Sequence, residues 1–182
     1  GMDLGNVNQV LWNTAHGNFL AFTNMAPIRS RLVLHVEPIL LLFVPFYWIG
    51  LGGPRLLLVA QAIIVGLGAF PLYWLARDTL LNPKSPISPG PCGAAGAGNL
   101  QSPISLLPLI FPLAYLLLPA LEAAVLYDFH TVTLAPTFLL FAFYYVEKDR
   151  PRLFSLFAAL TIACKEDMGL TVAMLGLYAL LA

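Results

Sequence analysis

Two pairs of ionisable side chains, each spaced i, i+2, have the residue types best suited to do chemistry. Asp128 and His130 form a short polar break between apolar runs, and His35 and Glu37 have the same spacing. Leaving such groups unpaired at membrane depth costs several kcal/mol. Pro38 favours extended backbone at Glu37, so His35 and Glu37 should point the same way. The pairs therefore indicate either an acid/base site or ligands of a divalent metal, namely Zn, Mn or Mg.

Each pair also has a purely structural interpretation. Asp128 could cap a helix that begins at Thr131, which would make the polar break a simple connecting turn. Glu37 could form a surface ion pair with Arg29 or Arg31. The sequence leaves both interpretations open.

A third charged group is the triplet Lys165-Glu166-Asp167, which lies between two apolar runs that are each short for a membrane crossing. If the triplet is sunk into the membrane, Lys165 is a candidate to bind a phosphate group as a point charge. The alternative is an interfacial turn whose charges pair with one another.

The polar stretch 3–38 is expected to supply the rest of a site. Residues 6–16 fit an amphipathic helix, with Asp3 as its N-cap and Gly17 as its C-terminal stop. One face of this helix is apolar, and the other carries a polar stripe of Asn6, Gln9, Asn13 and His16. We expect the helix to lie on a membrane surface with its apolar face in the headgroups.

The composition is that of an integral membrane protein. Of 182 residues, 59% are hydrophobic and 10% charged, and the mean hydropathy is +0.83; soluble domains carry about 25% charged residues. The net charge of zero gives no indication of a nucleic-acid partner. Cys92 and Cys164 form neither a CxxC motif nor a metal-ligand spacing, so we expect no structural disulfide. Because the chain ends inside an apolar run, we expect a fragment of a longer protein.

The hydropathy pattern predicts an all-α, polytopic helical bundle that forms a single membrane domain. Segment 39–50 is too short to cross and is expected to be re-entrant or interfacial. Segment 82–103 is rich in Pro, Gly, Ser and Ala and is predicted to be a flexible cytoplasmic linker. About five spans are expected, at residues 55–76, 104–127, 131–146, 153–164 and 169–182.

Counting the crossings predicts which polar segments share a side of the membrane. If 39–50 does not cross, then 128–130 and 165–167 emerge beside the polar stretch 3–38. The linker and residues 147–152 lie on the opposite side, with five basic residues, Arg77, Lys84, Lys148, Arg150 and Arg152. The positive-inside rule makes that opposite side cytoplasmic. We therefore expect Asp3, His35, Asp128 and His130 to converge around one cleft on the outer face.

Several motifs together resemble a known family. They are DLGNVNQVLWNTAHG, HVEPILLLFVPFYW, QAIIVGLGAFPLYWLAR, YLLLPALEAAVLYDFH and CKED. This combination resembles the polytopic membrane proteins of domain of unknown function 2079 (DUF2079), which are similar to the GT-C glycosyltransferase superfamily. Enzymes of that superfamily take a sugar from a polyprenyl-phosphate carrier on the extracytoplasmic face. The linker 82–103 is longer than the family pattern.

The resemblance implies roles for individual residues. Asp3 matches the essential acid early in the first outer loop, where it would act as a general base or hold a metal, and Asp128 matches a second outer-face acid. His130 joins them as a catalytic group, while His35 and Glu37 are the expected ligands of a divalent metal. Substrate contacts are expected from Gln9, Trp12, His16, Arg29, Lys165 and Glu166. The implied partners are the lipid bilayer and a polyprenyl-phosphate-linked sugar, and the implied location is the plasma membrane of a prokaryote.

Two other classes of function remain open from the sequence. In a transporter or channel, the same acids and histidines would form a proton or cation path. An inverted repeat would favour that class, and none is visible between the two halves. A structural membrane protein whose polar loops bind a partner is the third alternative.

Overall fold

The structure is a computed structural model that describes residues 2–23, 27–81 and 106–181. The predicted linker, with Lys84 and Cys92, lies outside the described residues. Within those ranges the regular elements are helices, and the only β pairing is an isolated bridge between Ala21 and Ser30. The prediction of an all-α fold is confirmed.

Two helical stretches are long and apolar enough to cross a membrane. The first joins α3 (Pro54–Leu67) to α4 (Ala69–Leu81), and the second joins η3 (Leu107–Leu109), α6 (Ile110–Leu116) and α7 (Pro119–Tyr127). Protein buries only 28% and 6% of their most apolar windows. Helices from the core of a soluble protein would be largely buried, so these surfaces suit contact with lipid.

The expectation of five spans is wrong for the part of the chain that the structure describes. Beyond the two long stretches, the apolar helices have 10–17 residues, whereas a crossing needs about 20. These shorter helices include η4 (Thr131–Leu134) with α8 (Ala135–Glu147), α9 (Pro151–Ile162) and α10 (Met168–Leu181). Local breaks limit their lengths: Asp149 has a φ of 51° just before the proline that begins α9.

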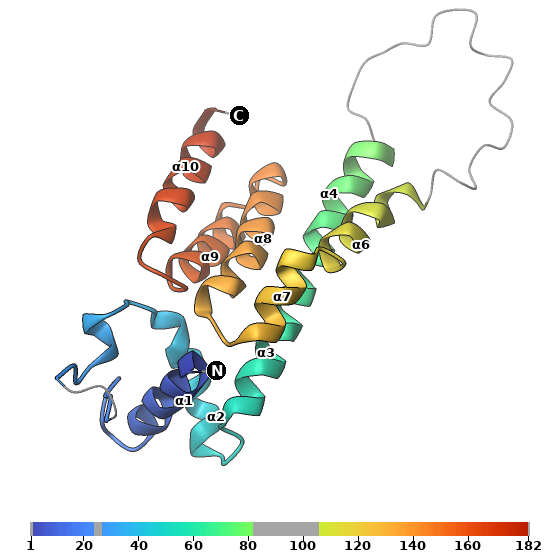
Figure 1. Cartoon of the computed structure of the whole chain (residues 1–182). Coiled ribbons are helices and arrows are strands. Elements are labelled where there is room, and N and C mark those ends of the chain that lie inside the picture. The colour runs from blue at the N-terminus through green and yellow to red at the C-terminus, as the bar shows by residue number, and fades with distance from the viewer. Residues whose placement is uncertain (1, 24–26, 82–105, 182) are drawn as a thin grey trace, which may run out of the picture.

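The N-terminal residues form a separate layer against one end of the helical bundle (Figure 1). This layer contains α1 (Met2–Ala15), η1 (Arg31–Val33), η2 (Pro38–Phe43) and α2 (Val44–Trp48). The stretch Pro38–Trp48 is one of the shorter apolar helices, in agreement with the prediction that 39–50 does not cross. Its start is fixed beside the bundle, because the amide of Ile39 donates to the carbonyl of Ala163 at 2.9 Å.

Helix α1 is amphipathic, as predicted, but its apolar face packs on protein and not on lipid headgroups. Val7 and Leu11 are buried in a cluster that is completed by other apolar residues of the layer and the bundle, Leu40, Phe43, Val44, Leu57 and Phe129. Gly17 ends the helix with a φ of 91°, and the amide of Asn18 reaches back to the carbonyl of Asn13 at 2.8 Å. This is a Schellman ending, which favours glycine.

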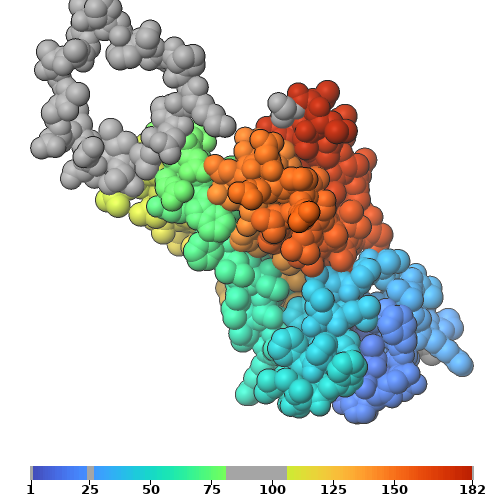
Figure 2. Space-filling view, turned by 180° about the vertical axis from the view of Figure 1, so that it is seen from behind, coloured from blue at the N-terminus to red at the C-terminus, as the bar shows by residue number. Residues whose placement is uncertain are grey.

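The predicted alternation of chain direction agrees with the contacts at the two ends of the bundle. Figures 1 and 2 show the N-terminal layer beneath the bundle, and Figure 1 shows that this is the end where α7 meets α8 and α9 meets α10. At the other end Lys148, after α8, forms an ion pair with Asp78 of α4 at 2.5 Å. The loops 128–130 and 163–167 therefore lie together beside the N-terminal layer.

Candidate functional site

A pocket of about 280 Å³ lies where the N-terminal layer meets these two loops. Its lining combines acids, bases and apolar groups: Asp3, Asn6, Phe22, Arg31, Leu34, His35, Glu37, Phe129, His130, Val132 and Lys165. Of the four residues expected to converge on one cleft, Asp3, His35 and His130 are in this lining. Asp128 lies behind it, 3% exposed.

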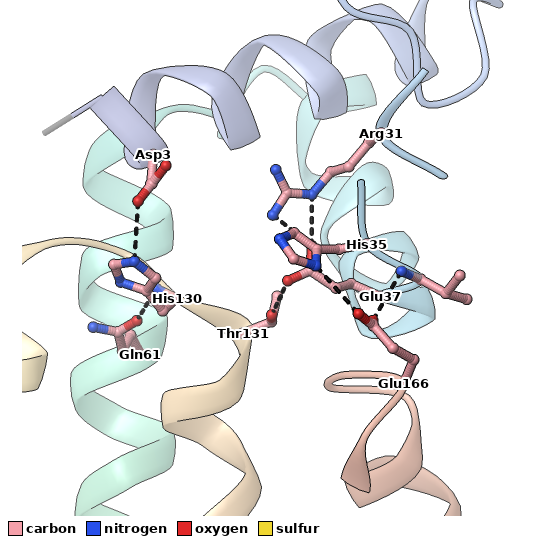
Figure 3. Close-up of polar contacts among 9 residues, drawn as sticks. Asp3, Arg31, His35, Glu37, Gln61, His130, Thr131 and Glu166 are labelled. Atoms are coloured by element: carbon pink, nitrogen blue, oxygen red, sulfur yellow. Dashed lines mark hydrogen bonds and ion pairs between the residues drawn. The ribbon is translucent and has the colours of Figure 1, made fainter. Parts of the chain in front are cut away.

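The Asp3 carboxylate and the His130 imidazole contact one another across this pocket (Figure 3). Oδ2 of Asp3 is 3.1 Å from Nε2 of His130, and both side chains are partly open to solvent, at 59% and 39% exposed. Asp3 comes from the first turn of α1, and His130 comes from the loop between α7 and η4. A carboxylate held by an imidazole and open to solvent is suited to accept a proton.

Asp128 has a structural partner that the sequence did not suggest. Its Oδ2 accepts the amide N–H of Asp3 at 3.2 Å, and its Oδ1 accepts that of Leu4 at 3.0 Å. The first amides of a helix have no partner within the helix. Asp128 thus caps α1, whereas the sequence suggested Asp3 as the cap of α1 and Asp128 as a cap for a helix at Thr131. Asp3 instead lies within the first turn.

Gln61 of α3 fixes the loop that carries Asp128 and His130. Its side chain is fully buried and donates to the carbonyl of Asp128 at 3.0 Å, while its Oε1 accepts the amide N–H of His130 at 2.9 Å. Gln61 was visible in the sequence only as a lone amide inside an apolar span. Such an amide indicates a buried hydrogen-bond partner without saying which one.

Glu37 forms a buried ion pair with Arg31, which is one of the two partners that the structural interpretation suggested. Glu37 is 8% exposed; its Oε2 lies 2.5 Å from Nη2 of Arg31, and its Oε1 accepts the hydroxyl of Thr131 at 2.5 Å. The pair lies in the pocket lining rather than on the surface. Arg31 and Thr131 are site residues that the sequence analysis did not select.

His35 bonds to Glu166, across the junction between the layer and the loop after α9 (Figure 3). Nδ1 of His35 is 3.2 Å from Oε1 of Glu166, whose Oε2 accepts the amide N–H of Val36 at 3.1 Å. Hydrogen bonds from its own backbone amide and from His35 lower the pKa of Glu166 from 4.5 to about 2. Lys165 lines the pocket and pairs with Asp167 at 3.3 Å, which agrees with the structural interpretation of the triplet; its binding of a phosphate stays a prediction.

Five predicted substrate-binding residues are absent from the pocket lining: Glu166, which bonds to His35, and Gln9, Trp12, His16 and Arg29. The side chain of Gln9 bonds to Thr23, and Trp12 stacks on His16 with ring centroids 3.9 Å apart on the outer side of α1. Arg29 is exposed in the segment that follows. A helix of known register brings only one of its faces to a pocket, and here that face carries Asp3 and Asn6.

The predicted divalent-metal site stays a prediction. Nowhere in residues 2–23, 27–81 and 106–181 do three or more His, Cys, Asp or Glu side chains gather closely enough to hold a metal. His35 and Glu37 have separate partners, Glu166 and Arg31. Asp3 and His130 supply two donor side chains, and the chemistry considered below is written for these residues alone.

The arrangement as a whole places a proton acceptor beside cationic groups at the end of an apolar bundle. Among curated proteins and solved structures, none matches the chain. One family profile does match, over residues 1–182, and its description is "Predicted membrane protein (DUF2079)". The chain therefore belongs to the DUF2079 family of predicted membrane proteins.

Proposed function

We propose that this chain forms the membrane-interface part of a glycosyltransferase that transfers a sugar from a polyprenyl-phosphate carrier to an acceptor hydroxyl. The observation that carries the proposal is the Asp3–His130 pair, in a pocket that Arg31 and Lys165 also line. A carrier-lipid enzyme needs a base for the acceptor and positive charge for the leaving phosphate, near the membrane surface.

In the proposed reaction, the acceptor oxygen attacks the anomeric carbon of the sugar and the bond from that carbon to the carrier phosphate breaks. Asp3 takes the proton of the acceptor hydroxyl, and His130 orients the Asp3 carboxylate. The carrier phosphate leaves with the electron pair of the broken bond. Lys165 is the cation best placed to meet it, since its side chain is 31% exposed and its partner Asp167 is 56% exposed.

Arg31 has a different role in this proposal. Its side chain is 12% exposed and is already paired with Glu37. The pair keeps a buried guanidinium at the pocket wall, where its N–H donors are held in place without having to reorganise. The pocket is proposed to open on the extracytoplasmic face of a prokaryotic plasma membrane, because Arg77 lies near the opposite end of the first long stretch, Pro54–Leu80.

The buried ionisable residues lie at the pocket end of the bundle. A proton or cation path needs ionisable groups within the bundle. In the described part of the chain, the buried ionisable residues are Glu37 and Asp128, both at the pocket end, and a reduced thiol, Cys164. The other buried polar residues there are uncharged: Asn13, Gln61, Thr131, Thr137 and Thr161.

The test is turnover of a radiolabelled polyprenyl-phosphate sugar by the full-length protein in liposomes. Asp3→Asn removes the proton acceptor while preserving side-chain size, so it should abolish turnover. Asp149→Asn is the matched control, because Asp149 lies at the opposite end and Asn tolerates its φ of 51°. Equal turnover by Asp3→Asn and wild type would contradict the proposal.

A further inference from the structure

We infer that Asp128 and Gln61 are positioning residues, which place the Asp3 carboxylate without contacting substrate. The inference rests on the proposed function for the role of Asp3, whereas the geometry that supports it is independent of any activity. Neither Asp128 nor Gln61 belongs to the pocket lining. Their effect on chemistry must therefore pass through the residues that they hold.

Asp128 holds the backbone of Asp3. Each oxygen of its buried carboxylate takes one amide from the first turn of α1, that of Asp3 at 3.2 Å and that of Leu4 at 3.0 Å. A negative charge at the N-terminus of a helix also interacts favourably with the helix dipole. The start of α1 is thus fixed to a residue 125 positions away in the sequence.

The same loop holds the side chain of Asp3. Asp128 and His130 both have extended backbone, with φ of −164° and −134°, and side chains two residues apart in extended chain point the same way. Asp128 therefore contacts the backbone of Asp3 while His130 contacts its carboxylate, at 3.1 Å. Two attachments made by one loop leave the Asp3 side chain little freedom to rotate.

Gln61 anchors this loop to α3, in the long helical stretch Pro54–Leu80. Its amide group donates to the carbonyls of Asp128 and Val125, at 3.0 and 3.4 Å, and accepts from the amide of His130 at 2.9 Å. Between the two polar residues Phe129 is fully buried, edge-on to Phe43 with centroids 5.9 Å apart. The loop is held by polar and apolar contacts on both sides, so it can transmit the position of α3 to Asp3.

The experiment uses the full chain in detergent with ¹⁵N-labelled histidine and backbone amides. Asp3→Asn will change the ring nitrogen signals of His130, because it alters the group that contacts them. Asp128→Asn should reproduce most of that change, although Asp128 does not hold the His130 ring. The side-chain nitrogen of the new asparagine cannot accept a hydrogen bond, whereas the carboxylate oxygen that it replaces does. The amides of Asp3 and Leu4 should therefore exchange with solvent about fivefold faster or more, as after loss of a helix cap.

A double variant sharpens the result. If Asp128 acts through Asp3, then Asp3→Asn combined with Asp128→Asn should change the His130 signals no more than Asp3→Asn alone. Asp167→Asn, an exposed acid of the neighbouring loop, should leave those signals unchanged. Asp128→Glu serves as a second variant. It keeps the negative charge, and its side chain, which is longer by one methylene group, should displace the first turn of α1.

Unchanged His130 signals and unchanged amide exchange in both Asp128 variants would overturn the inference, whatever the turnover. Absence of turnover by the wild-type protein would instead contradict the proposed function and leave the spectroscopic result intact. Where turnover is measurable, Asp128→Asn should lower kcat with little change in KM, because Asp128 lies outside the pocket. A rise in KM at constant kcat would also contradict a positioning role.

Discussion

The carboxylate of Asp3 lies 3.1 Å from the imidazole of His130, although 127 residues separate them in the chain. This contact joins the first turn of α1 to the loop between the second long helical stretch and α8. It is one of several hydrogen bonds between the N-terminal layer and the bundle. The others include those that Asp128 accepts from the amides of α1 and the one between His35 and Glu166. The pocket exists because the N-terminal layer and the bundle meet there.

Replacing Gln61 with Leu should destabilise the protein markedly. The substitution removes two hydrogen bonds, one from the amide of His130 and one to the carbonyl of Asp128, and losing a hydrogen bond in a buried setting costs about 1–3 kcal/mol. We expect a clearly lower thermal midpoint in detergent. Val59→Leu is the control, since Val59 lies two residues earlier on the same helix and is 57% exposed. Equal midpoints for the two variants would contradict the role of Gln61.

Gly68 and Gly66 offer a matched pair of substitutions where α3 meets α4. A Cβ atom at Gly68 would lie 2.5 Å from the hydroxyl of Tyr115 and 3.0 Å from that of Thr137, whereas at Gly66 nothing lies within 4 Å. Gly68→Ala should therefore cost about 1–3 kcal/mol through overpacking. Gly66→Ala should be neutral or stabilising by up to about 1 kcal/mol. Thermal unfolding of both variants in one detergent measures the difference; the reverse order would be evidence against this packing.

Acid should release the contact between Glu166 and the segment that carries His35. The pKa of Glu166 is lowered in the folded protein from 4.5 to about 2, so its contribution to stability is complete above pH 4.5. That contribution is lost as the pH falls from about 4.5 through about 2. The carboxyl carbon signal of Glu166 should titrate near pH 2, and the amide signal of Val36 should move with it. Titration near 4.5 would show that the bonds to His35 and Val36 do not form.

The arrangement of the loops can be tested by labelling. In a background in which Cys92 and Cys164 are replaced, Asp167→Cys and Asp78→Cys should react with an impermeant thiol reagent from opposite sides of the membrane, because Asp78 lies at the far end of the long stretch Pro54–Leu80. The two positions lie at opposite ends of the bundle, beside Lys165 and Lys148. Labelling of both from the same side would contradict the arrangement.

The sequence predicts the helical fold and the grouping of polar loops because both follow from short-range patterns. The apolar runs indicate helices, and their alternation brings 128–130 and 165–167 beside the N-terminal stretch. The number of spans was overestimated, because apolar runs such as Met168–Leu181 are shorter than a bilayer. Hydropathy indicates whether a segment lies in an apolar environment more reliably than it indicates the length of the helix that the segment forms.

The partners within the site could be predicted only in part, since they depend on three-dimensional register. The sequence identified His35, Asp128 and His130 as candidate site residues. It did not predict that Asp128 would cap α1 or that Glu166 would bond to His35. The apolar face of α1 was assigned to lipid, because an amphipathic pattern does not distinguish lipid from a protein neighbour such as Leu40.

The central claim is that Asp3 is the base of a sugar transfer from a polyprenyl-phosphate carrier, and one measurement tests it most directly. The full-length wild-type protein, Asp3→Asn and Asp149→Asn are reconstituted separately in liposomes with a radiolabelled polyprenyl-phosphate sugar, and the release of carrier phosphate is followed. The account predicts turnover by wild type and Asp149→Asn and none above background by Asp3→Asn, with all three proteins equally folded. Undiminished turnover by Asp3→Asn, or no turnover by wild type with any such donor, would contradict it.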